Sequence, residues 1–260
     1  DEAGALLSLP QHENLARFVT FDMAARPKPI LVMELIRGVG LDRLIRSRSL
    51  TVERAFSYLD GILAGLDAMH GVGVGHLDVK PSNVILRDGD IPVLVDFGLS
   101  RPAQLPDMLE EEFSLPMGTG PYISPEQVQF VRKDPRSDLF ALGVMLYHLT
   151  TGERTFGNPS SVSGLRKRLY TDPVPPRAHR SETPLWLQEV ILRCLEVQPE
   201  LRYQTGAQLA LDLQHPEQIP LTARAERMVT GSKLSTVKRW FKAMGAEPKH
   251  EDGANKHVER

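Results

Sequence analysis

The sequence has a single cysteine and little net charge, and each shortage excludes a class of protein. Cys194 alone rules out an internal disulfide and suits a reducing cytoplasm, where we predict that the protein acts. Because Cys194 lies in an apolar helical stretch, we expect it to be buried rather than reactive. The formal net charge of −2 gives no general attraction to nucleic acid or to anionic membranes, so neither is predicted as a partner.

Long apolar runs are also lacking. The longest, residues 30–36, contains Glu34 and is much too short to cross a bilayer, and no signal peptide is recognisable. The sequence therefore predicts no membrane span. With 41% hydrophobic and 25% charged residues, the composition is that of an ordinary globular protein with enough apolar residues for a large core.

Both ends of the sequence have features that we expect of a truncated chain. The chain opens on Asp1 rather than Met, already within a helical pattern over residues 1–11, and it ends in the polar residues 247–260. We expect a fragment of a longer protein with a further domain beyond the C-terminus.

Hydrophobic periodicity predicts a mainly helical chain. Apolar residues recur at helical spacing from Thr51, which can cap the N-terminus, to about Gly71. A helix over residues 137–150 is apolar on nearly every side, which is typical of a buried helix, and Gly152 ends it. Further helices are expected from Pro184 and from about Thr205.

A smaller part of the chain favours strands. Residues 30–35 are β-rich, and residues 84–86 and 92–95 read as a hairpin joined by the turn at residues 87–90. Residues 99–117 lack periodicity and are acidic, which indicates a long loop. A small β-containing part followed by helices predicts the α+β class.

Two short motifs carry the chemistry. Residues 76–83 place an Asp, a Lys and an Asn (Asp78, Lys80, Asn83) in one loop before the hairpin, and the second strand of the hairpin leads to Asp96. Carboxylate and amide oxygens suit Mg²⁺, a lysine suits a phosphate, and a further carboxylate can accept a hydroxyl proton. This set is what phosphoryl transfer requires. The alternative is a polar loop whose side chains only cap turns.

These residues resemble the protein kinase superfamily. Residues 76–83 match its catalytic loop and residues 96–98 its metal-binding Asp-Phe-Gly. The resemblance implies that Asp78 is the catalytic base and that Lys80 neutralises the γ-phosphate. It implies that Asn83 and Asp96 bind Mg²⁺ beside ATP. A lysine two places after the base is the serine/threonine pattern.

The resemblance continues over about residues 2–213. Residues 117–126 are similar to the segment that closes the activation loop, in which Thr119 would bond Asp78 and Lys80. Glu126 would pair with Arg202, and Asp138 would hold the catalytic loop's backbone. All three are implied to have scaffold roles. The Gly118–Thr119 pair and residues 124–127 most resemble bacterial members.

Residues 30–36 are similar to the strand that enters the hinge between the lobes. Met33 would be the gatekeeper, the backbone of Glu34 and Ile36 would meet the adenine edge, and Ile85 would pack beneath the ring. An apolar run of this kind is otherwise an ordinary core strand. Glu2 lies near the place of the glutamate that pairs with the phosphate-gripping lysine; a solvated helix face is the alternative.

The resemblance implies a two-lobed kinase fold with an incomplete small lobe. We expect residues 1–36 to form that partial lobe, residues 37–215 the helical lobe, and residues 216–260 an extension or linker. The implied activity is transfer of the ATP γ-phosphoryl group to Ser or Thr of protein substrates. The rival is a pseudokinase or nucleotide-binding scaffold, against which the intact Asp78, Asn83 and Asp96 argue.

The sequence departs from the family pattern in two places. A glycine-rich phosphate loop and its matching strand lysine do not occur, so we expect this piece alone to have little activity. Leu77 replaces the arginine that usually receives a phosphorylated activation loop. Because the loop already carries Asp107 and residues 110–112 are all Glu, we predict weak dependence on loop phosphorylation.

Two basic segments remain. Residues 166–168 read as a solvated face. Residues 235–244 form a basic pattern with apolar positions Val237, Trp240, Phe241 and Met244. This segment is expected to dock on the kinase or a neighbour, with a membrane surface or a partner as alternatives.

Overall fold

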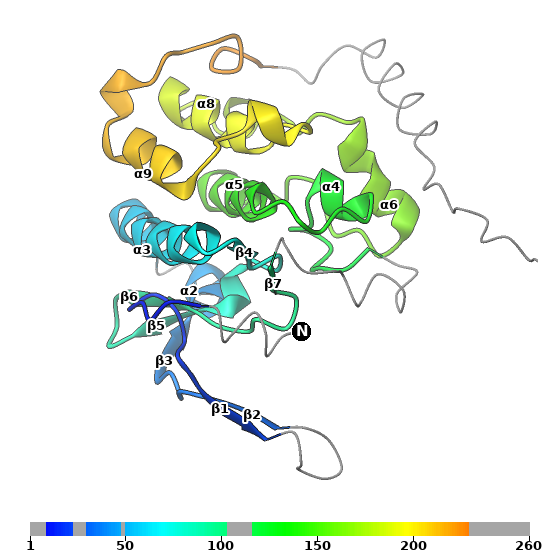
Figure 1. The fold of residues 1–260 in the computed structure, drawn as a ribbon. Coiled ribbons are helices and arrows are strands. Elements are labelled where there is room, and N and C mark those ends of the chain that lie inside the picture. The colour runs from blue at the N-terminus through cyan, green and yellow to red at the C-terminus, as the bar shows by residue number, and fades with distance from the viewer. Residues whose placement is uncertain (1–8, 23–29, 48–49, 103–115, 229–260) are drawn as a thin grey trace, which may run out of the picture.

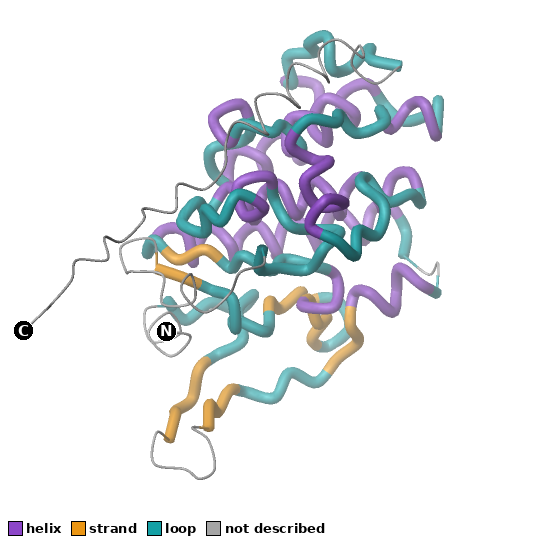
Figure 2. Tube along the Cα trace, turned by 90° about the vertical axis from the view of Figure 1, so that its right-hand side faces the viewer, coloured by secondary structure: helices purple, strands orange, loops and turns teal. Residues whose placement is uncertain are grey.

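The structure is a computed structural model that describes residues 9–22, 30–47, 50–102 and 116–228 (Figure 1). A small β-containing part is followed by a larger helical part, in agreement with the α+β prediction. Figure 2 shows most strands toward the lower end of the molecule and most helices above them. The strands are β1 (Phe18–Asp22), β2 (Ile30–Met33), β3 (Gly38–Gly40), β4 (Val74–Gly75), β5 (Val84–Arg87), β6 (Ile91–Leu94) and β7 (Arg101–Pro102).

The helical part stacks α3, α5, α8 and α9 in layers above the sheets (Figure 1). The α-helices are α2 (Leu41–Arg46), α3 (Val52–Gly71), α4 (Pro125–Val128), α5 (Arg136–Thr151), α6 (Val162–Arg166), α7 (Pro176–His179), α8 (Leu185–Cys194) and α9 (Gly206–Gln214). Single 3-10 turns are η1 (Pro81–Asn83), η2 (Lys167–Leu169), η3 (Pro199–Leu201) and η4 (Pro216–Gln218). Within the described ranges, no helix combines the length and the apolar character that a membrane crossing needs.

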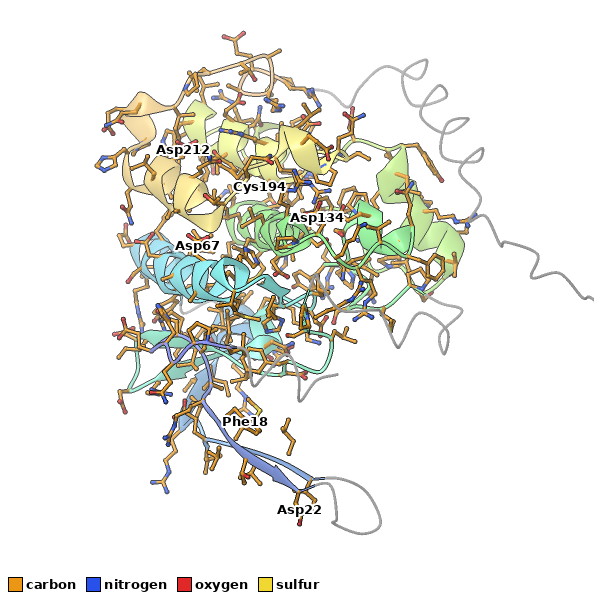
Figure 3. The ribbon with its side chains drawn as sticks, in the orientation of Figure 1. Phe18, Asp22, Asp67, Asp134, Cys194 and Asp212 are labelled. Carbon is orange, nitrogen blue, oxygen red and sulfur yellow. The ribbon has the colours of Figure 1, made fainter. Side chains whose placement is uncertain are left out.

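The early strands form a two-stranded antiparallel hairpin that extends away from the body (Figures 1 and 3). The predicted strand over residues 30–35 is confirmed as β2 but stops at Met33. Its partner β1 was not predicted. The helix predicted over residues 1–11 lies mostly outside the described residues, and residues 9–11 are not helical.

The long helix α3 confirms the periodicity from Thr51. Thr51 Oγ1 accepts a hydrogen bond from Arg54 N at 3.4 Å, which caps the first turn. The helix ends at Gly71, and Gly73 follows with φ 74°. The inward face of α3 lies in the main core and consists of Leu59, Ile62, Leu63, Leu66 and Met69.

The predicted hairpin is present as β5 and β6, and β3 extends it to a three-stranded sheet. Asp88 and Gly89 both have positive φ, 48° and 92°, as in a type I′ turn, and Asp90 N closes the turn by donating to Arg87 O at 3.2 Å. The segment before β1 is fastened to this sheet by backbone hydrogen bonds from Ala16 N to Leu94 O (2.9 Å) and from Leu94 N to Asn14 O (2.8 Å). The sheet therefore joins the β-containing part to the helical part.

The second long helix, α5, is buried along most of its length, as predicted. Gly152 ends it in the left-handed conformation, with φ 76°. Gly143 lets α5 approach α8 closely, since a Cβ there would lie 2.5 Å from Cys194 Cβ. Cys194 itself is buried between these helices (Figure 3), and burial raises the pKa of its thiol to about 12. The expectation of a buried cysteine is confirmed.

The helices predicted from Pro184 and Thr205 are confirmed as α8 and α9. Thr205 Oγ1 caps α9 by accepting from Gln208 N at 3.2 Å. Asp67 of α3 accepts from Gly206 N at 2.8 Å and thereby ties α9 to α3 (Figure 3).

Residues 216–228, which the sequence assigned to an extension or linker, pack on α8. Gln188 Nε2 donates to the carbonyl oxygens of Arg224 (2.9 Å), Ala225 (2.8 Å) and Arg227 (2.9 Å). The carboxylate of Glu189 accepts from Thr222 N (3.0 Å) and Ala225 N (3.1 Å). We call this set of contacts the α8 clasp. Because Gln188 and Glu189 are both buried, the clasp is part of the folded body.

The basic run at residues 166–168 is only partly solvated, which corrects the sequence interpretation. Arg166 and Lys167 are exposed, but Arg168 is 1% exposed. Its guanidinium donates to the carbonyls of Gly120 (2.7 Å) and Ile123, and burial lowers its pKa to about 10. Arg168 therefore supports the segment at residues 117–126.

Candidate functional site

The centre of the candidate site is a compact set of hydrogen bonds around the carboxylate of Asp78. Lys80 Nζ lies 2.5 Å from Asp78 Oδ2 and donates to Thr119 Oγ1 at 2.8 Å. Thr119 donates to Asp78 Oδ1 twice, from its backbone N at 3.0 Å and from Oγ1 at 2.7 Å. The contacts predicted between Thr119, Asp78 and Lys80 are therefore present.

The backbone of the loop before Asp78 is held by Asp138 in the first turn of α5. Asp138 is fully buried, and its two carboxylate oxygens accept from His76 N (2.9 Å) and Leu77 N (2.7 Å). His70 Nε2 also contacts Asp138 Oδ2, at 2.9 Å. Leu77 has φ 63°, a strained conformation for a leucine that these bonds hold in place. This confirms the contact predicted for Asp138.

Asn83 follows Asp78 on η1 and is joined to it through its side-chain nitrogen. Asn83 Nδ2 donates to Asp78 O at 3.0 Å and lies 3.3 Å from Asp78 Oδ2. Both contacts use the amide nitrogen, so the amide oxygen is the atom that suits a metal. The carbonyl of Asn83 accepts from Val95 N at 3.0 Å, which brings the next residue, Asp96, beside Asn83.

The donor set is suited to Mg²⁺ rather than to a transition metal. Asp96 is exposed, has φ 65° and offers two carboxylate oxygens. Asn83 offers its side-chain amide oxygen. The described part of the chain contains no group of three His, Cys, Asp or Glu side chains that could hold a metal ion by themselves. An ion here would need further oxygens from a phosphate and from water, which is how Mg²⁺ is commonly held beside nucleotides.

The hinge candidates lie in the β-containing part of the molecule. Met33 is the last residue of β2, and Glu34 N donates to Arg17 O at 2.9 Å. The Glu34 carboxylate fixes this turn by accepting from Arg17 N (2.9 Å) and Arg87 Nη2 (2.8 Å).

The other two hinge candidates are placed by the same sheet. Ile36 is partly buried against the main core, and Ile85 in β5 is paired with Gly40 of β3. Among the described residues, the hinge candidates share no hydrogen bond with the Asp78 cluster. They are joined to it through β5, which begins directly after Asn83.

A buried ion pair holds the segment that carries Thr119. Arg202 binds both carboxylate oxygens of Glu126, each at 2.7 Å, and Ser137 Oγ donates to Glu126 Oε1 at 2.6 Å. The predicted Glu126–Arg202 pair is therefore present. Both side chains are buried, so the pair is a structural anchor rather than a group that could meet a substrate.

Sequence reasoning missed two residues that support the site. Gln127 completes a capping box with Ser124 and donates from Nε2 to Leu77 O at 2.8 Å, which joins α4 to the catalytic loop. Arg132 is buried and donates to Leu99 O at 2.9 Å, just after residues 96–98. The Ser-x-x-Gln spacing of a capping box was a visible signal for Gln127, whereas nothing local marks Arg132.

Several predicted residues lie outside the described parts of the chain. Glu2 is one, and so are the acidic positions Asp107 and 110–112 and the basic pattern at residues 235–244. Leu77, which replaces the usual arginine, is buried with 4% exposure.

The fold and the site together define a protein kinase. The protein kinase domain family matches residues 1–215, and the chain belongs to that family. It is similar to serine/threonine-protein kinase PknB of Mycobacterium tuberculosis strain H37Rv, with 34% identity over 190 residues, covering 73% of this chain and 30% of the relative.

Two further relatives agree. PknB of Mycobacterium leprae is 32% identical over 193 residues, covering 74% of this chain and 31% of the relative. A Clostridium acetobutylicum protein named "Probable serine/threonine-protein kinase" is 31% identical over 184 residues, covering 70% and 28%. The chain thus spans about a third of the length of these relatives.

Proposed function

We propose that this chain supplies the catalytic loop and metal site for serine/threonine protein phosphorylation by the full-length protein, with ATP as phosphoryl donor and Mg²⁺ as metal. The observation that carries the proposal is the hydrogen-bonded set of Asp78, Lys80, Thr119 and Asn83. The names of the relatives, all serine/threonine-protein kinases, support the same activity.

Asp78 is proposed as the catalytic base. In the reaction, the acceptor hydroxyl oxygen forms a bond to the γ-phosphorus, the bond from that phosphorus to the bridging oxygen breaks, ADP leaves, and the hydroxyl proton passes to Asp78. Asp78 is held for this task from both sides, by Thr119 at Oδ1 and by Lys80 at Oδ2. Its carboxylate accepts from Thr119 N, Thr119 Oγ1, Lys80 Nζ and, at 3.3 Å, Asn83 Nδ2, so a substrate hydroxyl is proposed to replace the longest of these contacts, the one from Asn83.

Lys80 is proposed to bind the transferred phosphoryl group. Its ammonium uses two donors, toward Asp78 and Thr119, and a third remains. Asn83 and Asp96 are proposed to hold Mg²⁺, which when bound neutralises phosphate charge. Met33, Glu34, Ile36 and Ile85 are proposed to line the adenine site, with the Glu34 carbonyl as one hydrogen-bond acceptor.

The preference for Ser and Thr rests on Thr119. Its hydroxyl bridges Asp78 and Lys80, and Lys80 stands two places after the base, which is the serine/threonine pattern of the family. Protein substrates are proposed because an ordered segment, residues 116–128, lies next to the base. We also propose that the protein acts in the cytoplasm and that the whole protein contains further domains.

The test is a phosphorylation assay of the full-length gene product with radiolabelled ATP and a protein substrate. Asp78→Asn should abolish labelling while Mg²⁺-dependent ATP binding persists, because the nucleotide is proposed to be held by other residues. Asp88→Asn, on the exposed hairpin turn, is the matched control and should leave labelling unchanged. Labelling by the Asp78→Asn protein at the wild-type rate would refute the assignment. No labelling by the wild type, with ATP binding intact, would favour the scaffold alternative.

A further inference from the structure

A pocket of about 230 Å³ lies in the helical part, among the start of α3, the end of α5 and the residues that lead into α8. Asp138, which holds the catalytic loop, is in the first turn of α5, whereas Leu149 lines the pocket from the last turn. Since an α-helix rises 1.5 Å per residue, these two residues are about 16 Å apart along the helix axis. The pocket is therefore separate from the Asp78 cluster.

The walls of this pocket are mainly apolar. Its inner part is formed by the buried side chains of Leu59, Leu146 and Leu187, one from each of the three packed helices. Phe56 of α3 and Trp186 of α8 also line it, and their ring centroids are 5.9 Å apart with the planes tilted by 42°. Leucine and aromatic walls suit an apolar ligand, and the two rings favour an aromatic one, which they can contact by face or edge.

One buried polar side chain of the pocket lacks a partner. Thr183 is 4% exposed and lines the pocket, yet its hydroxyl makes no hydrogen bond to any residue in the described part of the chain. The indole N–H of Trp186 is also without a hydrogen-bond partner among the described residues. Because buried polar groups are normally hydrogen-bonded, an occupant that can bond the Thr183 hydroxyl is favoured over a purely apolar one.

The rim of the pocket carries one charge of each sign, and the two are paired. Arg180 Nε donates to Glu182 Oε1 at 3.0 Å, and Arg180 Nη1 donates to Thr150 O at 3.0 Å. Arg180 and Glu182 are the charged residues that line the pocket, so its rim offers no uncompensated charge to a ligand. A neutral ligand therefore fits better than a carboxylic acid or an amine.

The volume sets the size of the ligand. An apolar cavity of about 150 Å³ accepts benzene, and sites for drug-sized molecules begin at about 300 Å³. The pocket lies between these sizes. We propose that it binds a neutral aromatic small molecule of about two fused rings, whose rings contact Phe56 and Trp186 and whose hydroxyl or carbonyl group bonds the hydroxyl of Thr183.

Equilibrium dialysis of the full-length protein against 2-naphthol, with naphthalene and decanoate as comparison ligands, tests the proposal. Ala55→Phe fills the pocket from α3, because Ala55 lines it. Ala64→Phe is the matched control, since Ala64 is exposed on the same helix and does not line the pocket. Thr183→Val removes the hydroxyl and keeps the shape of the side chain. Circular dichroism and urea unfolding check that each variant is folded.

The wild type should bind 2-naphthol at a saturable site, about fivefold more tightly than naphthalene, as one net hydrogen bond provides. Ala55→Phe should weaken this binding by at least about tenfold, because the ring occupies the site, and Ala64→Phe should leave it unchanged. Thr183→Val should remove the preference for 2-naphthol over naphthalene, a ratio that does not depend on the stability of the variant.

Three results would overturn the proposal. The first is no saturable binding of 2-naphthol by the wild type at millimolar concentration, and the second is equal binding by the wild type and a folded Ala55→Phe protein. The third is a preference for 2-naphthol that persists in Thr183→Val. Tighter binding of decanoate than of 2-naphthol would also overturn it, in favour of an acyl chain as the ligand.

Discussion

The buried pair of Glu126 and Arg202 should be among the most sensitive positions in the molecule. The Arg202 side chain is 0% exposed and that of Glu126 is 8% exposed, and the two 2.7 Å bonds are bidentate. Glu126→Gln keeps the size and one acceptor but removes the negative charge. Arg202 would then be a buried cation without its counter-charge.

Removing one partner of a buried pair commonly costs about 3–5 kcal/mol, and the isosteric change should fall near the lower value. The remaining bonds of Arg202, to the carbonyls of Glu196 (2.8 Å), Arg136 (3.1 Å) and Val197 (3.1 Å), limit the loss because they still solvate the guanidinium. With a urea m-value of about 2–3 kcal/mol/M, the unfolding midpoint should fall by about 1–1.5 M.

Urea unfolding followed by circular dichroism measures this shift. Glu200→Gln is the matched control, since Glu200 is 70% exposed and lies 3.4 Å from Arg136, and such surface pairs contribute about 0–1 kcal/mol. If Glu126→Gln moves the midpoint no more than Glu200→Gln does, the argument that this pair anchors the segment is wrong.

Four further outcomes are expected. Asp138→Asn should lower kcat by more than about tenfold with little change in ATP affinity, because one of the two oxygens that accept from the His76 and Leu77 amides is replaced by a donor. Steady-state kinetics measures the change in kcat, and ATP titration measures the affinity. Thr119→Val should lower kcat by about a hundredfold, whereas Thr119→Ser retains the hydroxyl and most of the rate. Phosphatase treatment of the full-length protein should leave most of its activity, and a large loss would contradict the role inferred from Leu77. The thiol of Cys194 should react with iodoacetamide only on unfolding. The free energy of unfolding should fall as pH rises from about 9 to about 12, because the thiol loses its proton at lower pH in the unfolded chain than in the folded one.

The sequence predicted long and periodic elements well and short ones poorly. The helices α3 and α5 and the β5–β6 hairpin follow from repeated apolar spacing and turn residues, which act locally. The helices α2, α4, α6 and α7 have six or fewer residues, too few for a helical period to be visible, and β1 was missed although strands of four residues were predicted. Their positions depend on packing with distant parts of the chain.

The residues of the candidate site also differ in how well the sequence predicted them. Asp78, Lys80 and Asn83 are close in sequence, so their grouping could be predicted, and the resemblance supplied the contact to Thr119. The burial of Arg168, Gln188 and Arg132 could not be predicted, because their partners lie far along the chain or are backbone carbonyls. Polar residues that bind carbonyls carry no pattern that distinguishes them from solvated ones.

The bonds from Asp138 have a consequence for how this molecule opens. The amides of His76 and Leu77 belong to a loop, yet their hydrogen-bond acceptor is a side chain of the buried helix α5. They are released only when the loop or the first turn of α5 leaves the core, because Asp138 is fully buried. In hydrogen–deuterium exchange, these two loop amides should therefore exchange much more slowly than the amides of exposed loops such as residues 88–90.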